Sequence, residues 1–100
     1  MMKPLLMLSF MLALPTVHAI EADSCEVWQQ KANSFMTWRQ QGTSIAEAMQ
    51  ETAGNQSRGL LLRAYGEPVE QGLEAQYKVI GDFSQTVFDE CHAGKTKSDN

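Results

Sequence analysis

Residues that build catalytic and metal sites are scarce in this sequence. It contains two His and two Cys in 100 residues, and His92 is the only His after residue 19. Zinc-protease, serine-hydrolase, phosphate-loop and calcium-loop motifs are absent. Cys91 and His92 are adjacent, and consecutive helical side chains diverge by about 100°, so the two are badly placed as a nucleophile and its base. The sequence therefore predicts a protein that is not an enzyme and needs no metal or cofactor.

Positive charge is also in short supply. The chain carries 8 Lys and Arg against 12 Asp and Glu, a formal net charge of −4. Lys3 is the only charged residue before Ile20, so the rest of the chain is more acidic still. Proteins that bind nucleic acids need clustered Lys and Arg to neutralise backbone phosphates. The composition therefore argues against nucleic acid as a partner.

Only one long apolar segment occurs, the ten residues Leu5–Leu14. It follows Lys3 and precedes Pro15, and residues 17–19 fit an export cleavage site. Ten helical residues extend about 15 Å, half the hydrocarbon thickness of a bilayer, which disfavours a transmembrane helix. We expect a signal peptide at 1–19 that is cleaved after Ala19, a protein in the periplasm or outside the cell, and no membrane insertion after cleavage. An uncleaved anchor is the alternative.

Cys25 and Cys91 are the only cysteines, so one intramolecular pairing exists. Export leads to an oxidising compartment, where paired thiols form disulfides. Closing a loop of about 66 residues would stabilise the fold by about 4 kcal/mol in the chain-entropy account. A redox pair is typically C-x-x-C, and a metal site needs more ligands than these Cys and His92 supply. We therefore predict a structural disulfide.

Helical spacing dominates the chain after residue 22. Asp23 and Glu26 resemble a capping box, and the pattern continues to Gln41, where Gly42 is typical of a helix end. The apolar face of this predicted helix consists of Cys25, Trp28, Ala32, Phe35 and Met36. The polar side chains, Gln40 among them, lie on the opposite face.

Two short helices are predicted next. Ser44 and Glu47 form a second capping box, and this helix ends near Ala53. Ser57 predicts the cap of the next helix, which stops at Gly66.

The last predicted helix is the longest. Pro68 suits its first turn, its apolar stripe runs from Val69 to Cys91, and Gly94 ends it. Gly81, beside the stripe, predicts a close helix contact. The fold class is therefore all-α: a small disulfide-stapled bundle of two long antiparallel helices and two short connecting helices that cover the apolar stripes. We expect a single helical domain at 20–94 and a flexible polar tail at 95–100.

Several short motifs occur in a recognisable order: Cys25, Arg39-Gln40-Gln41-Gly42, Ala64-Tyr65-Gly66-Glu67-Pro68, Phe83 and Cys91. This order resembles a group of uncharacterised small exported proteins of proteobacteria and phages with the pattern Cys…R-Q-x-G…A-Y-x-x-P…Phe…Cys. The resemblance covers most of the chain after the expected signal peptide. It implies an all-helical, disulfide-tied exported protein, and it implies no activity.

Two pairs of residues are candidates for contacts with a partner. Trp28 and Trp38 lie ten residues apart, about 15 Å along a helix. One of them facing outward would be an interaction hot spot, and two core aromatics are the alternative. Arg39 and Tyr65 are interpreted as packing and capping residues, with a partner contact as the second interpretation.

The acidic residues give a further candidate surface. Glu47 with Glu51 and Glu70 with Glu74 are spaced to share a helix face, where they form a solvated surface or contact a basic partner. We expect a non-enzymatic protein that binds another protein of the cell envelope, as an inhibitor or immunity-type binder. An acid- or stress-responsive periplasmic chaperone is the alternative, and a small hydrolase or metal-binding protein is the competing class.

Overall fold

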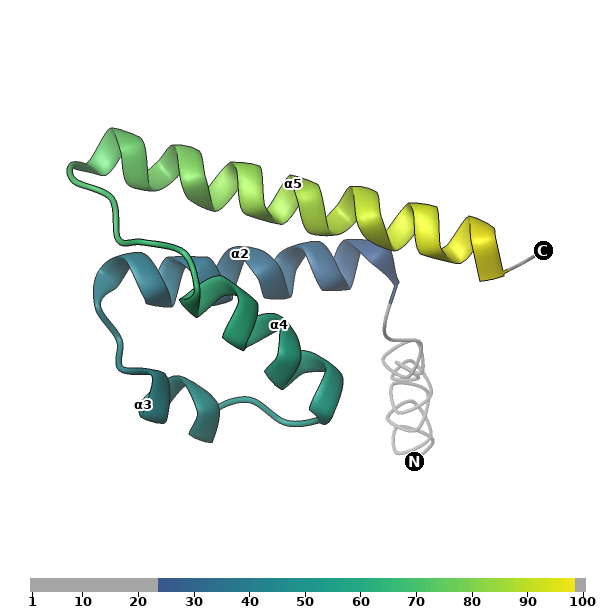
Figure 1. Ribbon diagram of the computed structural model, residues 1–100, viewed down its shortest axis with the longest axis horizontal. Coiled ribbons are helices and arrows are strands. Elements are labelled where there is room, and N and C mark those ends of the chain that lie inside the picture. The colour runs from purple at the N-terminus through teal and green to yellow at the C-terminus, as the bar shows by residue number, and fades with distance from the viewer. Residues whose placement is uncertain (1–23, 99–100) are drawn as a thin grey trace, which may run out of the picture.

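The computed structural model describes residues 24–98, which form four helices and no strand (Figure 1). The helices are α2 (Cys25–Gln41), α3 (Ile45–Gln50), α4 (Asn55–Tyr65) and α5 (Leu73–Ser98). The two long helices are antiparallel and come first and last along the chain, and the two short helices lie between them in sequence. Cys25 is bonded to Cys91. The predicted fold class is therefore confirmed. The predicted signal peptide lies outside the described residues.

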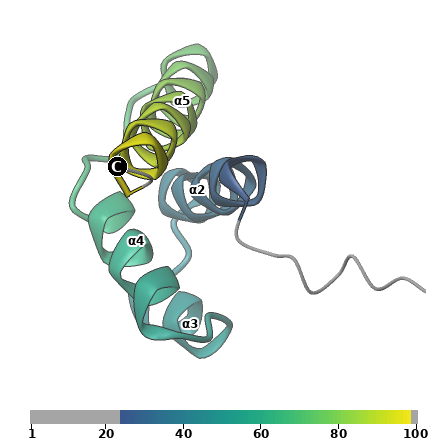
Figure 2. The same ribbon diagram turned by 90° about the vertical axis from the view of Figure 1, so that its right-hand side faces the viewer.

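Helix α2 is the centre of the arrangement. It packs against α5 on one side and against α4 and α3 on another, and α3 also packs against α4 (Figure 2). The disulfide joins the first turn of α2 to the C-terminal part of α5, with 5.6 Å between the two Cα atoms. No helix among residues 24–98 is both long and apolar enough to cross a membrane.

Both ends of α2 are set by residues directly beside them in the sequence. The hydroxyl of Ser24 accepts a hydrogen bond from the Val27 N–H at 3.2 Å, so Ser24 is the cap, and not Asp23, which lies outside the described residues. Gly42 adopts φ 87°, and its N–H and that of the next residue bond to carbonyls of the last turn. This is the left-handed helix end that the glycine predicted.

The short helices differ from the prediction in two boundaries. Helix α3 ends at Gln50, three residues before the predicted end near Ala53. Ser44 caps α3 through the Glu47 N–H at 3.1 Å, as predicted. Helix α4 begins at Asn55, after Gly54 with φ 92°, and has no side-chain cap. The prediction that Ser57 caps α4 is therefore wrong, and Ser57 is buried inside the first turn, where its hydroxyl accepts a bond from another helix.

Helix α5 starts later and ends later than predicted. It begins at Leu73, after Gly72 with φ 91°, because residues 67–70 are held in a non-helical turn by contacts with α2. It continues through Gly94 to Ser98. A glycine inside a helix costs about 1 kcal/mol relative to alanine, which the rest of a long helix readily absorbs.

The core lies where α2, α4 and α5 meet, and Met36 and Leu61 are fully buried in it. The buried cluster consists of Ala32, Phe35, Met36, Ala48, Leu60, Leu61, Ala64, Phe83 and Val87.

The start of α5 lies outside this core. Leu73 and Tyr77 are 65% and 68% exposed, so the prediction that the short helices cover the whole stripe is wrong. A side chain at Gly81 would meet nothing within 4 Å, so the predicted close contact at this glycine is wrong as well.

Candidate functional site

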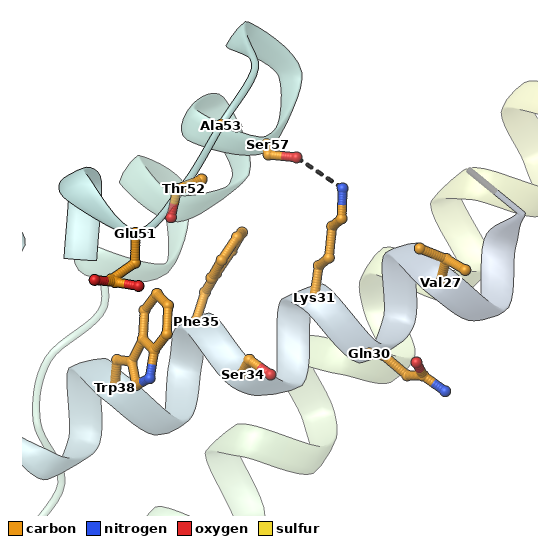
Figure 3. A pocket seen from close by; sticks show the side chains of 10 residues that line it. All are labelled: Val27, Gln30, Lys31, Ser34, Phe35, Trp38, Glu51, Thr52, Ala53 and Ser57. Atoms are coloured by element: carbon orange, nitrogen blue, oxygen red, sulfur yellow. Dashed lines mark hydrogen bonds between the residues drawn. The ribbon is translucent and has the colours of Figure 1, made fainter. Parts of the chain in front are cut away.

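A groove between α2 and the connection from α3 to α4 is the best candidate for a binding site (Figure 3). Its volume is about 420 Å³, and we call it the aromatic groove. It is lined by Val27, Gln30, Lys31, Ser34, Phe35, Trp38, Glu51, Thr52, Ala53 and Ser57.

The floor of the aromatic groove is built by α2. Phe35 and Trp38 are three residues apart and therefore lie on one side of the helix, with ring centroids 5.6 Å apart. Phe35 is buried in the core, whereas Trp38 is half-buried. In Figure 3 both rings project from α2 toward Thr52 and Ala53 of the α3–α4 connection. The groove thus presents an aromatic floor that continues into the hydrophobic core.

Lys31 lies in the part of the aromatic groove away from Trp38. Its ammonium donates a hydrogen bond to the Ser57 hydroxyl at 2.9 Å, drawn as a dashed line in Figure 3, and lies 4.9 Å from the centre of the Trp28 ring. No carboxylate among the described residues forms an ion pair with this half-buried cation. Sequence reasoning missed Lys31, although its position three residues after Trp28 is the spacing at which helical neighbours touch.

Trp28 lines a second hollow beside the first. This hollow has a volume of about 380 Å³ and shares Lys31, Ala53 and Ser57 with the aromatic groove. Both tryptophans are half-buried and pack against the core. Each tryptophan therefore combines the two interpretations made from the sequence, core residue and exposed contact residue, since it packs against the core and also lines an open hollow.

The four predicted glutamates lie in two places, two on α3 and its C-cap and two around the start of α5. Glu51 is the C-cap of α3 and lies beside Trp38 in the aromatic groove (Figure 3), and Glu47 is exposed on the same helix. Glu70 precedes α5, whereas Glu74 lies in its first turn. The prediction that Glu70 and Glu74 share a helix face is therefore wrong, because the helix starts after Glu70.

Arg39 and Tyr65 tie the end of α2 to the turn that follows α4. The Arg39 guanidinium donates to the Glu67 carbonyl at 2.7 Å and lies 5.5 Å from the centre of the Tyr65 ring. The Tyr65 hydroxyl donates to the Thr43 carbonyl at 2.8 Å, and burial raises the pKa of this hydroxyl. Both side chains therefore have the packing and capping roles of the first interpretation. A partner contact by either stays a prediction.

Gln40 completes this arrangement. Its amide nitrogen donates to the Pro68 carbonyl at 2.9 Å, and its amide oxygen accepts from the Glu70 N–H at 2.8 Å. The side chain is buried, so its placement on the polar face was wrong. We call Arg39, Gln40 and Tyr65 the turn lock. The only sequence signal for Gln40 was its place in the R-Q-x-G pattern.

Charged groups elsewhere make few contacts between helices. Arg63 of α4 forms a two-pronged ion pair with Glu90 of α5, at 2.7 and 2.9 Å. The hydrogen bond raises the pKa of Arg63 and lowers the pKa of Glu90. The His92 ring lies 4.5 Å from the ring of Phe88. Among the described residues, no three His, Cys, Asp or Glu side chains gather as a metal site would require.

Comparison of the chain with protein-family models, curated proteins and solved structures found no match. Function is therefore inferred from the residues of this chain, and above all from the aromatic groove.

Proposed function

We propose that this protein is an exported, non-enzymatic binding protein that recognises another protein of the cell envelope through the aromatic groove. The expected signal peptide supports export, and the Cys25–Cys91 disulfide is compatible with an oxidising compartment outside the cytoplasm. The single observation that carries the proposal is a groove with a Trp and a Phe in its floor on a small domain. Interfaces draw most of their binding energy from such aromatic residues.

The charges on the two sides of the aromatic floor indicate what the partner presents. Lys31 has a hydroxyl and an aromatic ring as neighbours, so a carboxylate of the partner would supply the counter-charge that it lacks. Glu51, beside Trp38, favours a basic group. The seven helical steps from Lys31 to Trp38 span about 10 Å, the length of three extended residues. The partner segment is therefore short, acidic at one end, apolar in the middle and basic at the other end.

The inhibitor or immunity-type version of this function adds the three other predicted glutamates, of which Glu47 and Glu74 are exposed and Glu70 is half-buried. Glu47, Glu70 and Glu74 lie outside the aromatic groove and would meet a basic rim of the partner. Such rim charges mainly raise the association rate and make it depend on salt. The affinity itself would come from the groove.

Affinity capture from the cell envelope at low salt, followed by titration calorimetry with the purified partner, tests the proposal. We expect one defined partner to be enriched. Trp38→Ala should weaken its binding at least tenfold, because a central aromatic residue of an interface is worth about 2 kcal/mol or more. Lys31→Glu should weaken it through the reversed charge. Leu62→Ala, at an exposed residue of α4 outside the groove, is the matched control and should bind normally. Equal binding by Trp38→Ala and wild type would contradict the proposal.

The acid-responsive chaperone is a second candidate, and the Arg63–Glu90 pair favours it. This ion pair joins α4 to α5, and protonation of Glu90 in strong acid would remove it. Loss of the pair would remove a contact that joins α4 to α5, and α5 already carries exposed apolar residues. A dye for apolar surfaces should then bind near pH 3. A fully native near-ultraviolet circular dichroism spectrum at this pH would exclude the chaperone.

A further inference from the structure

A third hollow, between α2 and α5, differs from the aromatic groove in its lining. Its volume is about 360 Å³, and neither α3 nor α4 contributes to it. Helix α2 supplies amide and hydroxyl side chains, including Asn33 and Thr37, and α5 supplies Leu73, Tyr77 and Ile80. None of its lining residues is charged, although 20% of the chain is. An uncharged face of this kind is suited to a partner that carries the same net charge as the chain itself.

The α5 side of this hollow has both projecting side chains and a gap. Leu73 and Tyr77 are one helical turn apart and are the most exposed large apolar residues of the described chain. Gly81 follows one turn later, and a side chain at this position would meet nothing within 4 Å. Leu73, Tyr77 and Gly81 therefore form a row along one side of α5, with two apolar side chains followed by an empty place.

We propose that this face binds a second copy of the chain, with the two α5 helices antiparallel about a twofold axis at Tyr77. A twofold interface uses the same surface on both copies, so the surface must be complementary to itself. In antiparallel pairing about residue 77, positions equally far from it meet. Leu73 of each copy then packs into the place left free by Gly81 of the other, and the two Tyr77 rings lie side by side at the axis.

The charges beside this row fit the same pairing. Glu74 and Lys78 lie next to each other on the outer edge of α5, and both are exposed. Glu74 lies three positions before residue 77 and Lys78 one position after it, so this pairing leaves Glu74 of each copy and Lys78 of the other offset by two residues, about 3 Å along the axis. Both side chains are long enough to bridge this offset, so two opposite-charge pairs flank the contact. Lys78 already bonds Asp82 at 2.7 Å and can reach both carboxylates. This pairing leaves the aromatic groove open, so dimer formation and partner binding are independent proposals.

Sedimentation equilibrium of the purified, disulfide-bonded protein tests the dimer. We expect twice the monomer mass at concentrations on the order of 100 μM, since an interface built on two apolar residues per copy belongs to the small, weak class. Tyr77→Glu should give a monomer at the same concentrations. Leu62→Glu, which places the same charge on an exposed leucine of α4, is the matched control and should remain dimeric. A wild-type monomer throughout, or equal loss of the dimer in both variants, would overturn the proposal.

Two further variants separate the proposed contact from an effect on folding. Gly81→Leu should raise the melting temperature measured at low concentration, because leucine favours helix and has free space here, yet it should weaken dimerisation at least tenfold by filling the gap. Glu74→Lys should also weaken the dimer, and adding Lys78→Glu should restore it, because the double variant exchanges the charges of each pair. A Gly81→Leu protein that dimerises like wild type, or a double variant that stays as weak as Glu74→Lys, would overturn the geometry.

Discussion

The two ends of the α2–α5 pair are joined by different kinds of bond. At the end where α2 begins, the Cys25–Cys91 disulfide connects the helices covalently. At the end where α2 stops and α5 starts, the turn lock holds backbone groups of residues 67–70 by hydrogen bonds (Figure 1). The disulfide restricts the unfolded chain, whereas the turn lock selects one conformation of the turn in the folded chain. The first brings the helices together, and the second decides where α5 begins.

Removing the disulfide should have the largest effect on the free energy of unfolding. The double variant Cys25→Ser with Cys91→Ser should lose about 4 kcal/mol of unfolding free energy, because a closed loop with a sequence separation of 66 residues no longer restricts the unfolded chain. Urea titration followed by circular dichroism measures the loss. Wild-type protein should take up no alkylating reagent without a reductant, and a loss under about 1 kcal/mol would show that the helix packing alone holds this end.

Breaking the turn lock should have the next largest effect. Gln40→Ala removes a buried amide that bonds both the Pro68 carbonyl and the Glu70 N–H, so a loss of about 2 to 3 kcal/mol is expected in the same titration. Gln41→Ala is the matched control, since Gln41 is the exposed neighbour with no hydrogen bond of its side chain, and it should stay within about 0.5 kcal/mol of wild type. Equal losses at both positions would contradict the role of Gln40.

A pair of caps compares the two ends directly. Ser24 caps α2 beside the disulfide, and Ser44 caps α3 beside the turn lock. Ser24→Ala and Ser44→Ala should each cost about 1 kcal/mol, because each exposes one N–H that the hydroxyl satisfied. A much smaller cost at Ser24 alone would mean that the neighbouring disulfide already fixes the first turn of α2.

The smallest effect is expected at the Arg63–Glu90 pair, which joins α4 to α5. Both side chains are about half exposed, so Glu90→Gln should cost less than about 1 kcal/mol at neutral pH. The folded-state pKa of Glu90 is lowered, so its contribution is present above the unfolded-state pKa and is lost as pH falls through the folded-state pKa. The difference in unfolding free energy between wild type and Glu90→Gln should therefore vanish in strong acid and shrink in 1 M salt. If the difference in unfolding free energy persists in acid, it comes from the packing of the Glu90 side chain and not from its charge.

Features that depend on a few neighbouring residues could be predicted from the sequence. Gly42 as a left-handed helix end and Ser44 as a cap act within one turn of their own backbone, and both are confirmed. The pairing of Cys25 with Cys91 followed from their number alone. The cap of α2 was misplaced by one residue, since Asp23 and Ser24 are both good caps and adjacent.

Features that depend on contacts between distant segments could not be predicted. Pro68 suits a helix start, yet Gln40 and Arg39 hold this segment outside α5. Ser57 suits a cap, yet α4 starts earlier and Ser57 is used by Lys31. The aromatic groove likewise needs α2 and the α3–α4 connection to meet, so the sequence indicated its tryptophans but missed Lys31.

The sequence by itself determined that this protein is helical, where its first helix stops, and which cysteines are bonded, because glycine conformation, capping and cysteine number act without distant partners. Only the tertiary structure decided the start of α5, the burial of Gln40 and the exposure of Leu73 and Tyr77. Each of these features depends on the backbone or side chain that a neighbouring helix places against the residue. Residues 28 to 30 positions apart in the sequence come together only when the helices pack.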